Sequence, residues 1–133
     1  MACWTFLDFV DDRGENQIRA WIEGQPPSFG KRLRATLNAR LDLLSAMKPL
    51  RGLPYTKILD GECDGLFEIR FKANNVQCRP LCFYGPNRTE ITILMGAKEM
   101  NGRFVPPNAC TTAQSRKALV ESERRYVREH ERR

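Results

Sequence analysis

The sequence lacks any long apolar run, and this absence excludes a membrane-spanning protein. Nowhere does it approach the roughly 18 consecutive apolar residues that a transmembrane helix needs, and its mean hydropathy is −0.51. Residues 1–12 (MACWTFLDFVDD) also lack the basic start of a signal peptide and soon turn acidic. We therefore expect no membrane partner and a cytoplasmic location.

The sequence also has few histidines and no cysteine motif typical of a metal site. His130 is the only histidine, and the chain has no CxxC pair. An odd number of scattered cysteines is a poor disulfide framework, and the cytoplasm keeps thiols reduced. A zinc site would have too few good ligands. We expect no metal, no cofactor and no disulfide, with Cys78 and Cys82 as small core residues. The other cysteines are Cys3, Cys63 and Cys110.

Basic residues, by contrast, are abundant. The 133 residues carry a net charge of +6, with a pI near 9.3 and 41% hydrophobic side chains. This length and composition suit a single domain, residues 1–133, with a real core. The positive charge favours a polyanionic partner, either nucleic acid or an acidic protein, and solubility alone is the other interpretation.

The first half of the chain predicts one strand followed by a helical hairpin. Residues 4–10 alternate loosely and are rich in aromatics, which favours a strand. A short helix around Ile18 and Ile22 ends at Gly24. A longer helix from Ser28 has a single apolar stripe: Phe29, Leu33, Leu37, Leu41 and Leu44. The basic residues beside this stripe indicate a solvated face or a contact with RNA or an acidic partner: Lys31, Arg32, Arg34 and Arg40.

The second half predicts an antiparallel meander of three strands. Residues 66–72 alternate strictly between apolar and charged side chains. Residues 76–84 form the next strand, in which Pro80 predicts a bulge or an open side because proline cannot donate to a ladder. Residues 89–95 form the third strand, and Asn74-Asn75 marks a turn.

A last helix is expected from about Thr111, after the prolines at 106 and 107. Residues 121–133 are nearly all charged, so we expect this tail to fray or to meet a partner. The fold class is therefore α+β, with one helix face and one sheet face sharing the core.

Several ordered pieces of the sequence resemble a known superfamily. They are Gly52-Leu53 with Lys57, the LFEIR run at 66–70, Arg79 with Cys82-Phe83-Tyr84, residues 91–95 leading to Lys98, and Ala113, Arg116 and Arg125-Tyr126 in the last helix. In order and spacing the chain resembles the RelE/ParE superfamily, in its HigB-like, phage-derived branch. The resemblance implies a twisted antiparallel sheet (an N-terminal strand plus the meander) packed against a helical hairpin, with a C-terminal helix.

The resemblance also implies an activity and partners. Such toxins are endoribonucleases that cut mRNA in the ribosomal A site, and a helix-turn-helix antitoxin neutralises them. Carried over residue by residue, the functional cluster is Arg70, Arg79 and Lys98. The sequence departs from the family where Lys98 is followed by Glu99, since many members have a second basic residue there.

Metal-free RNA cleavage gives each of these residues a possible role. The 2′-hydroxyl attacks the neighbouring phosphate, which requires a base, cations around the developing charge and an acid for the leaving oxygen. Arg70 and Arg79 would grip the phosphate, Lys98 would assist the leaving oxygen and Glu68 would be the base. The alternative for the charges of this strand, Glu68, Arg70 and Lys72, is a cross-strand ion-pair ladder.

Four further residues are candidate RNA contacts: Lys72, Lys57, Arg103 and Tyr84. Tyr84 would stack a base or polarise a proton, or else lie in the core with its hydroxyl at the rim. Three rival functions stay open. They are a toxin of the same fold that targets gyrase, a non-catalytic phage module that binds nucleic acid or protein, and a degenerate toxin without activity.

Overall fold

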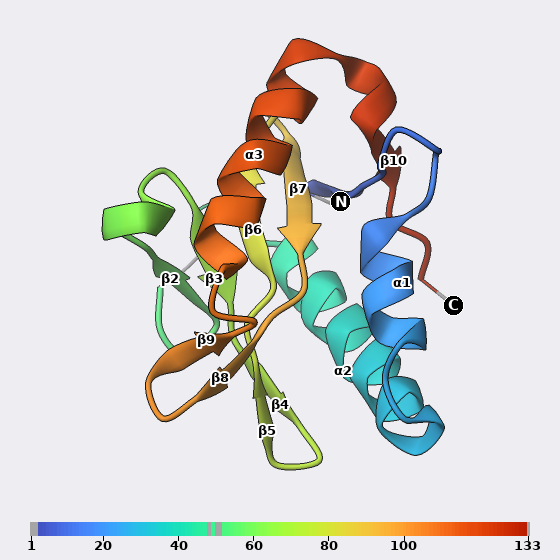
Figure 1. Ribbon diagram of the computed structural model, residues 1–133, viewed down its shortest axis with the longest axis vertical. Coiled ribbons are helices and arrows are strands. Elements are labelled where there is room, and N and C mark those ends of the chain that lie inside the picture. Colours follow the sequence, from blue (N-terminus) through green and yellow to red (C-terminus); the bar gives the residue numbers. More distant parts are fainter. Residues whose placement is uncertain (1–2, 48, 50–51, 133) are drawn as a thin grey trace.

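The computed structural model describes residues 3–47, 49 and 52–132. It is an α+β fold in which a six-stranded sheet has helices on both faces (Figure 1). Helices α1 (Gln17–Glu23) and α2 (Pro27–Ser45) cover one face, and α3 (Ala109–Ser122) covers the other. A smaller four-stranded sheet extends from one end of the larger one.

The strands are short and lie in two sheets. The six-stranded sheet has the order β10 (Val127–Glu129), β1 (Thr5–Phe9), β7 (Glu90–Met95), β6 (Leu81–Tyr84), β3 (Phe67–Ile69), β2 (Thr56–Ile58). The four-stranded sheet has the order β4 (Phe71–Ala73), β5 (Val76–Cys78), β8 (Lys98–Met100), β9 (Arg103–Val105). Two short 3-10 helices, η1 (Gly61–Cys63) and η2 (Arg124–Tyr126), complete the elements.

The expectation of a purely antiparallel sheet is wrong at one position. Strand β1 pairs in parallel with β7, with Thr5 opposite Glu90. Parallel neighbours need a long crossover connection, and the chain between β1 and β7 supplies one through α1 and α2. The remaining pairs of the larger sheet are antiparallel, so the sheet is mixed.

The two long strands expected at 66–72 and 76–84 are each divided in two. The first divides at Arg70 into β3 and β4, and the second divides at Arg79 and Pro80 into β5 and β6. In both cases one half joins the larger sheet and the other joins the smaller. A proline without an N–H cannot continue the ladder, which agrees with the break at Pro80.

Positive backbone angles at asparagines shape two hairpins of the smaller sheet. Asn74 and Asn75, with φ of 49° and 65°, form the expected turn between β4 and β5. The hairpin of β8 and β9 is not anticipated by the sequence analysis, although Asn101-Gly102 is a strong signal for the same kind of turn.

The apolar stripe of the long helix is confirmed. Leu33, Leu37, Leu41 and Leu44 on α2 are fully buried against the sheet, where burying each side chain contributes about 1.5–3 kcal/mol. The opposite face of the sheet forms a second core with α3, which begins at Ala109, two residues before the expected start.

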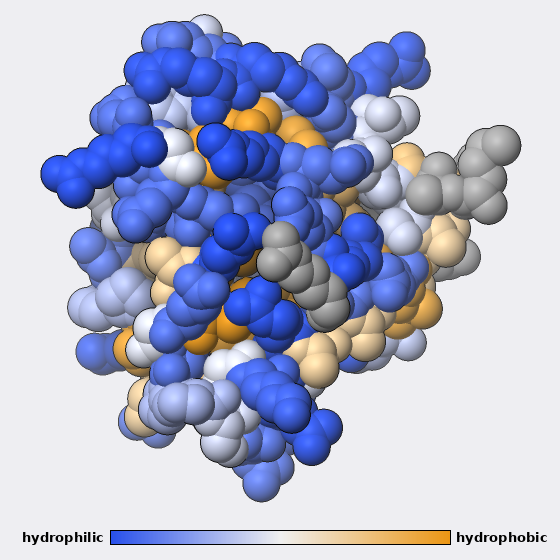
Figure 2. All heavy atoms as spheres, turned by 90° about the vertical axis from the view of Figure 1, so that its right-hand side faces the viewer, coloured by the Kyte–Doolittle hydropathy of each residue, from blue (hydrophilic) through white to orange (hydrophobic). Residues whose placement is uncertain are grey.

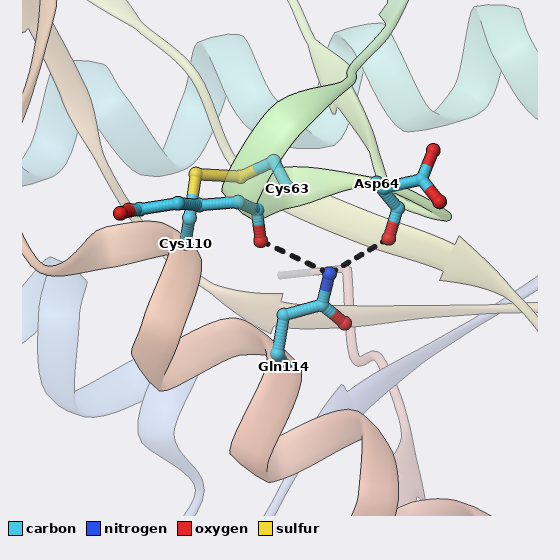
Figure 3. Close-up of a disulfide and its surroundings, with 5 residues drawn as sticks. Cys63, Asp64, Cys110 and Gln114 are labelled. Atoms are coloured by element: carbon cyan, nitrogen blue, oxygen red, sulfur yellow. Dashed lines mark hydrogen bonds between the residues drawn. A yellow bond between two sulfur atoms is a disulfide. The ribbon is translucent and has the colours of Figure 1, made fainter.

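A disulfide on the α3 face contradicts the expectation that all cysteines are reduced. Cys63 of η1 and Cys110 of α3 are bonded, with their Cα atoms 4.9 Å apart (Figure 3). Beside it, the Gln114 side chain donates to the backbone oxygens of Glu62 and Asp64. The 47-residue separation of the cysteines hides this pairing from sequence spacing. Cys78 and Cys82 are buried free thiols in the core, as expected.

The charged C-terminal tail does not fray within the described residues. It forms η2 and then β10, which pairs antiparallel with β1. His130 follows β10 and is buried against Asp8 and Asn38. Residues that look like a solvated tail in sequence thus complete one edge of the larger sheet.

Figure 2 shows one face on which hydrophilic side chains predominate and hydrophobic ones appear only in small patches. No helix within the described ranges has the length and apolarity to cross a membrane.

Candidate functional site

The site lies where the two sheets meet. The chain passes from the larger to the smaller sheet at Arg70 and returns at Arg79. Both side chains contact Glu68 of β3 at this junction, and Arg79 also contacts Glu99 of β8. We call Glu68, Arg70, Arg79 and Glu99 the junction cluster.

Arg79 is buried, with only 3% of the residue exposed. Its Nε lies 3.2 Å from Glu68 Oε2 and donates to Glu99 Oε1 at 3.1 Å. Its Nη1 donates to the Cys78 carbonyl at 2.9 Å, and its Nη2 donates to Gln77 Oε1 at 2.8 Å. All three guanidinium nitrogens are therefore engaged inside the protein, and Arg79 holds the two carboxylates in place.

Glu68 is as enclosed as Arg79, whereas Arg70 and Glu99 are partly exposed. Arg70 Nη1 donates to Glu68 Oε2 at 2.6 Å, and about a quarter of the Arg70 side chain is exposed. Burial raises the pKa of the Glu68 carboxyl above its ordinary value, and the charges of Arg70 and Arg79 only partly oppose this. Glu68 consequently keeps a proton to higher pH than a surface glutamate, which makes its carboxylate a better base.

Two pockets open beside the cluster. The large pocket, of about 430 Å³, is lined by Arg40, Leu53, Pro54, Tyr55, Arg70, Phe71, Lys72, Gln77 and Arg79. The small pocket, of about 170 Å³, is lined by Lys57, Leu59, Glu68, Arg70, Glu99, Gly102, Arg103 and Phe104. Arg70 lines both pockets, so it is the one member of the cluster that a ligand in either pocket can reach.

Most of the candidates from the sequence gather here. Lys72 lines the large pocket, while Lys57 and Arg103 line the small one. Lys57 stands opposite Glu68 in the pairing of β2 with β3. The structure thus brings cations from three strands, β2, β4 and β9, to the two pockets beside the junction cluster.

Lys98 and Tyr84 lie elsewhere. The Lys98 ammonium donates to Gln25 Oε1 at 2.8 Å and sits 4.9 Å from the centre of the Phe29 ring, beside the helical hairpin. Tyr84 packs against Trp4 and Phe67, with ring centres 5.4 Å and 4.7 Å away. Neither residue belongs to the lining of the large or the small pocket.

Arg40 and Tyr55 are site residues whose position the sequence analysis misses. The Arg40 guanidinium lies 4.9 Å from the centre of the Tyr55 ring, and its Nη1 donates to the Arg70 carbonyl at 2.7 Å. Arg40 is noticed in the sequence only as one of several basic residues beside the leucine stripe. Its helical position does not reveal that it reaches across to the hinge between β3 and β4.

The chemistry of the site comes from carboxylates and cations. Among the residues that the structure describes, no group of three or more His, Cys, Asp or Glu side chains is arranged to hold a metal ion. A raised-pKa carboxyl can accept or hold a proton, and the surrounding cations can bind an anion such as phosphate.

Comparison with known proteins places this site within a family. No curated protein matches the sequence. The family model described as "Phage derived protein Gp49-like (DUF891)" matches residues 20–118, well over half of the 133-residue chain. That span includes every residue of the junction cluster and both pocket linings. The chain therefore belongs to the phage-derived Gp49-like family, a toxin-like family of toxin–antitoxin systems.

Proposed function

We propose that the protein is the toxin of a type II toxin–antitoxin pair, with a RelE-like fold of the HigB-like branch. It acts in the cytoplasm as a metal-independent endoribonuclease on mRNA bound to the ribosome, and a helix-turn-helix antitoxin neutralises it. The observation that carries the proposal is the placement of Arg70 between two cation-lined pockets, in contact with the buried Glu68.

The cations provide the affinity for the RNA backbone. Arg70 is the best candidate to grip the scissile phosphate because it is partly exposed and a guanidinium suits phosphate bidentately. Lys57 and Arg103 flank it in the small pocket and would bind the neighbouring phosphate or its developing charge. Such a polyanion contact predicts binding that weakens steeply with salt.

Glu68 is the proposed general base. It would take the proton of the 2′-hydroxyl as the 2′-oxygen bonds to phosphorus and the bond from phosphorus to the 5′-oxygen breaks. The products are a 2′,3′-cyclic phosphate and a 5′-hydroxyl. A positioned base contributes about 10²- to 10⁴-fold to such a step. Lys57, which shares the small pocket with Glu68, is better placed than Lys98 to give a proton to the leaving 5′-oxygen.

Arg79 receives a different role from the phosphate grip expected from the resemblance. Its nitrogens are already bonded to Glu68, Glu99, Gln77 and the Cys78 carbonyl. We therefore assign it the positioning of the Glu68 carboxylate. The ribosome would supply the remaining alignment, so we expect much weaker cleavage of free RNA.

The test is to map mRNA 5′ ends in a reconstituted translation reaction, with and without ribosomes. We expect new ends within codons in the ribosomal A site, and a fall of about 10²- to 10⁴-fold in Glu68→Gln. Glu121→Gln makes the same carboxylate-to-amide change at an exposed position of α3 and serves as the charge-matched control. Full cleavage by a folded Glu68→Gln variant would remove Glu68 from the mechanism.

A second candidate function follows from the engagement of Arg79. Because that arginine is fully bonded within the protein, the cluster could also serve as structure in a non-catalytic binding module or in a gyrase-directed toxin of the same fold. Salt-sensitive RNA binding without new 5′ ends would favour the binding module. Inhibition of DNA supercoiling by gyrase, again without new ends, would favour the gyrase-directed toxin.

A further inference from the structure

We propose that the large pocket is a nucleobase site, in which a base of single-stranded RNA stacks on the Arg40–Tyr55 pair. Arg70 and Lys72 would hold the phosphates on either side of that base. The inference rests on the proposed function in taking RNA as the ligand, but it concerns binding and does not require that the RNA be cut.

The stacking surface is built from two distant segments and is held in place. Arg40 comes from α2, and Tyr55 precedes β2. The guanidinium lies over the ring at 4.9 Å and donates to the Arg70 carbonyl at 2.7 Å. The Tyr55 carbonyl in turn accepts from the Arg70 N–H at 2.8 Å. Both members of the pair are thus tied to Arg70, the residue proposed to grip the phosphate, which sets the base beside the backbone that carries it.

The lining of the pocket combines the two chemistries that a nucleotide needs. Leu53, Pro54 and Phe71 provide apolar wall, and Leu53 is 67% exposed at the rim. Arg70 and Lys72 provide positive charge. The volume of about 430 Å³ falls in the range of roughly 300–1,000 Å³ that is usual for ligand pockets. A nucleotide within an RNA strand has a flat base and a phosphate on each side. It therefore matches both the apolar wall and the positive charge of the pocket.

An acidic segment of a partner protein is the competing occupant. Carboxylates would use the cations, but they have no use for an aromatic ring that is stacked under the Arg40 guanidinium. Bases stack on aromatic rings and on arginine planes in single-stranded RNA recognition, and this stacking tolerates any sequence. The Arg40–Tyr55 pair therefore favours RNA.

Equilibrium binding of a short 2′-O-methyl oligonucleotide to the purified protein tests the inference, since this RNA has no free 2′-hydroxyl and cannot be cut. We expect Tyr55→Leu and Arg40→Lys each to weaken binding about 5- to 150-fold, the loss of one stacked base. Arg40→Lys keeps the charge, so its salt dependence should match that of the wild type, whereas Lys72→Gln should lower the salt slope by about one. Arg19→Gln, at an exposed position of α1, is the control and should bind like the wild type.

A measurement on the wild-type chain guards against variants that do not fold. An oligonucleotide with 4-thiouridine should crosslink to Tyr55 or Arg40, and an oligonucleotide with one abasic position should lose the same affinity as Tyr55→Leu. Wild-type affinity in a folded Tyr55→Leu protein, or displacement of the crosslink by poly-glutamate but not by RNA, would overturn the inference. Tight base-dependent binding without mRNA cleavage would overturn only the proposed nuclease activity. Unchanged mRNA cleavage by Tyr55→Leu would overturn only the base site.

Discussion

Two buried polar clusters lie in the described part of the chain, and they differ in what lies next to them. The junction cluster opens into two pockets through Arg70 and Glu68. The tail cluster consists of Asp8, Asn16, Asn38 and His130. His130 Nδ1 lies 2.8 Å from Asp8 Oδ1, its Nε2 lies 2.8 Å from Asn38 Oδ1, and Asn16 donates to Asp8 at 2.9 Å. Neither the large nor the small pocket reaches the tail cluster.

The comparison shows that similar buried polar groups can either stabilise the fold or be accessible to a ligand. Buried polar groups must be satisfied by partners, and both clusters meet this requirement. In the tail cluster the partners enclose one another and join β1, α2 and the segment after β10. This cluster therefore stabilises the fold. In the junction cluster one arginine has a side that faces open space, so a ligand can use it. Asp8 and His130 also lie outside the residues that match the family model, whereas the junction cluster lies inside them.

The largest expected effect concerns the disulfide, which lies in the hydrophobic cluster beside the small pocket. Cys63 and Cys110 share a hydrophobic cluster with Leu59 and Phe104, two residues that line the small pocket. For a 47-residue separation, the chain-entropy relation gives about 4 kcal/mol of unfolding free energy. We expect Cys63→Ser to lose an amount of this order in urea unfolding, and the wild type to lose it on reduction. A reduced wild type as stable as the oxidised one would show that packing alone holds this cluster.

Asp8→Ala should break the tail cluster at a cost of about 3 kcal/mol. The substitution leaves one nitrogen of the buried His130 and the half-buried Asn16 amide without their acceptor. Thermal or urea unfolding measures the loss, and binding of the oligonucleotide to the folded fraction should stay at the wild-type value. A fall in RNA affinity beyond what the unfolded fraction explains would show that the tail cluster affects RNA binding. That result would contradict the independence of the two clusters.

The pH dependence of stability should distinguish the junction cluster. The folded-state pKa of Glu68 is raised above the ordinary 4.5, so the folded chain binds this proton more tightly than the unfolded chain. Its contribution is fully present below the unfolded pKa and is lost as the pH rises through the folded pKa. The stability of the wild type relative to Glu68→Gln should therefore decline with rising pH from about 4.5. Urea unfolding at several pH values measures this difference in unfolding free energy. A difference that stays constant or rises with pH would show that the charges of Arg70 and Arg79 outweigh the effect of burial on the Glu68 pKa.

The smallest effect is expected at the surface pair of Arg124 and Glu90. Two hydrogen bonds of 2.7 and 2.6 Å from Arg124 lower the pKa of Glu90. The stability from this pair is present above the unfolded pKa of Glu90 and is lost as the pH falls through the folded one. We expect Arg124→Gln to cost about 0.5 kcal/mol at neutral pH and less in acid. If Arg124→Gln lowers the free energy of unfolding by the same amount in acid as at neutral pH, Arg124 acts through the packing of η2.

Periodic patterns allow much of the fold to be predicted from the sequence. The leucine stripe of α2, the alternation of Phe67, Ile69 and Phe71, and the turn at Asn74-Asn75 are all present in the structure. These features are local, because burial on one side of a helix or strand repeats with a fixed period. The same alternation predicts that Glu68 and Arg70 share one face, which the ion pair between them satisfies.

Pairings between distant residues are what the sequence could not supply. It does not reveal that Arg79 turns inward to two carboxylates, that Cys63 meets Cys110, or that Arg40 lies over Tyr55. Each of these depends on which elements meet and on where a strand leaves one sheet for another. The residue types therefore determined that the protein would be basic, α+β and equipped with charged strand faces. Only the tertiary structure decided which charges face each other and which face a pocket, because side-chain partners are set by packing across the chain and not by spacing along it.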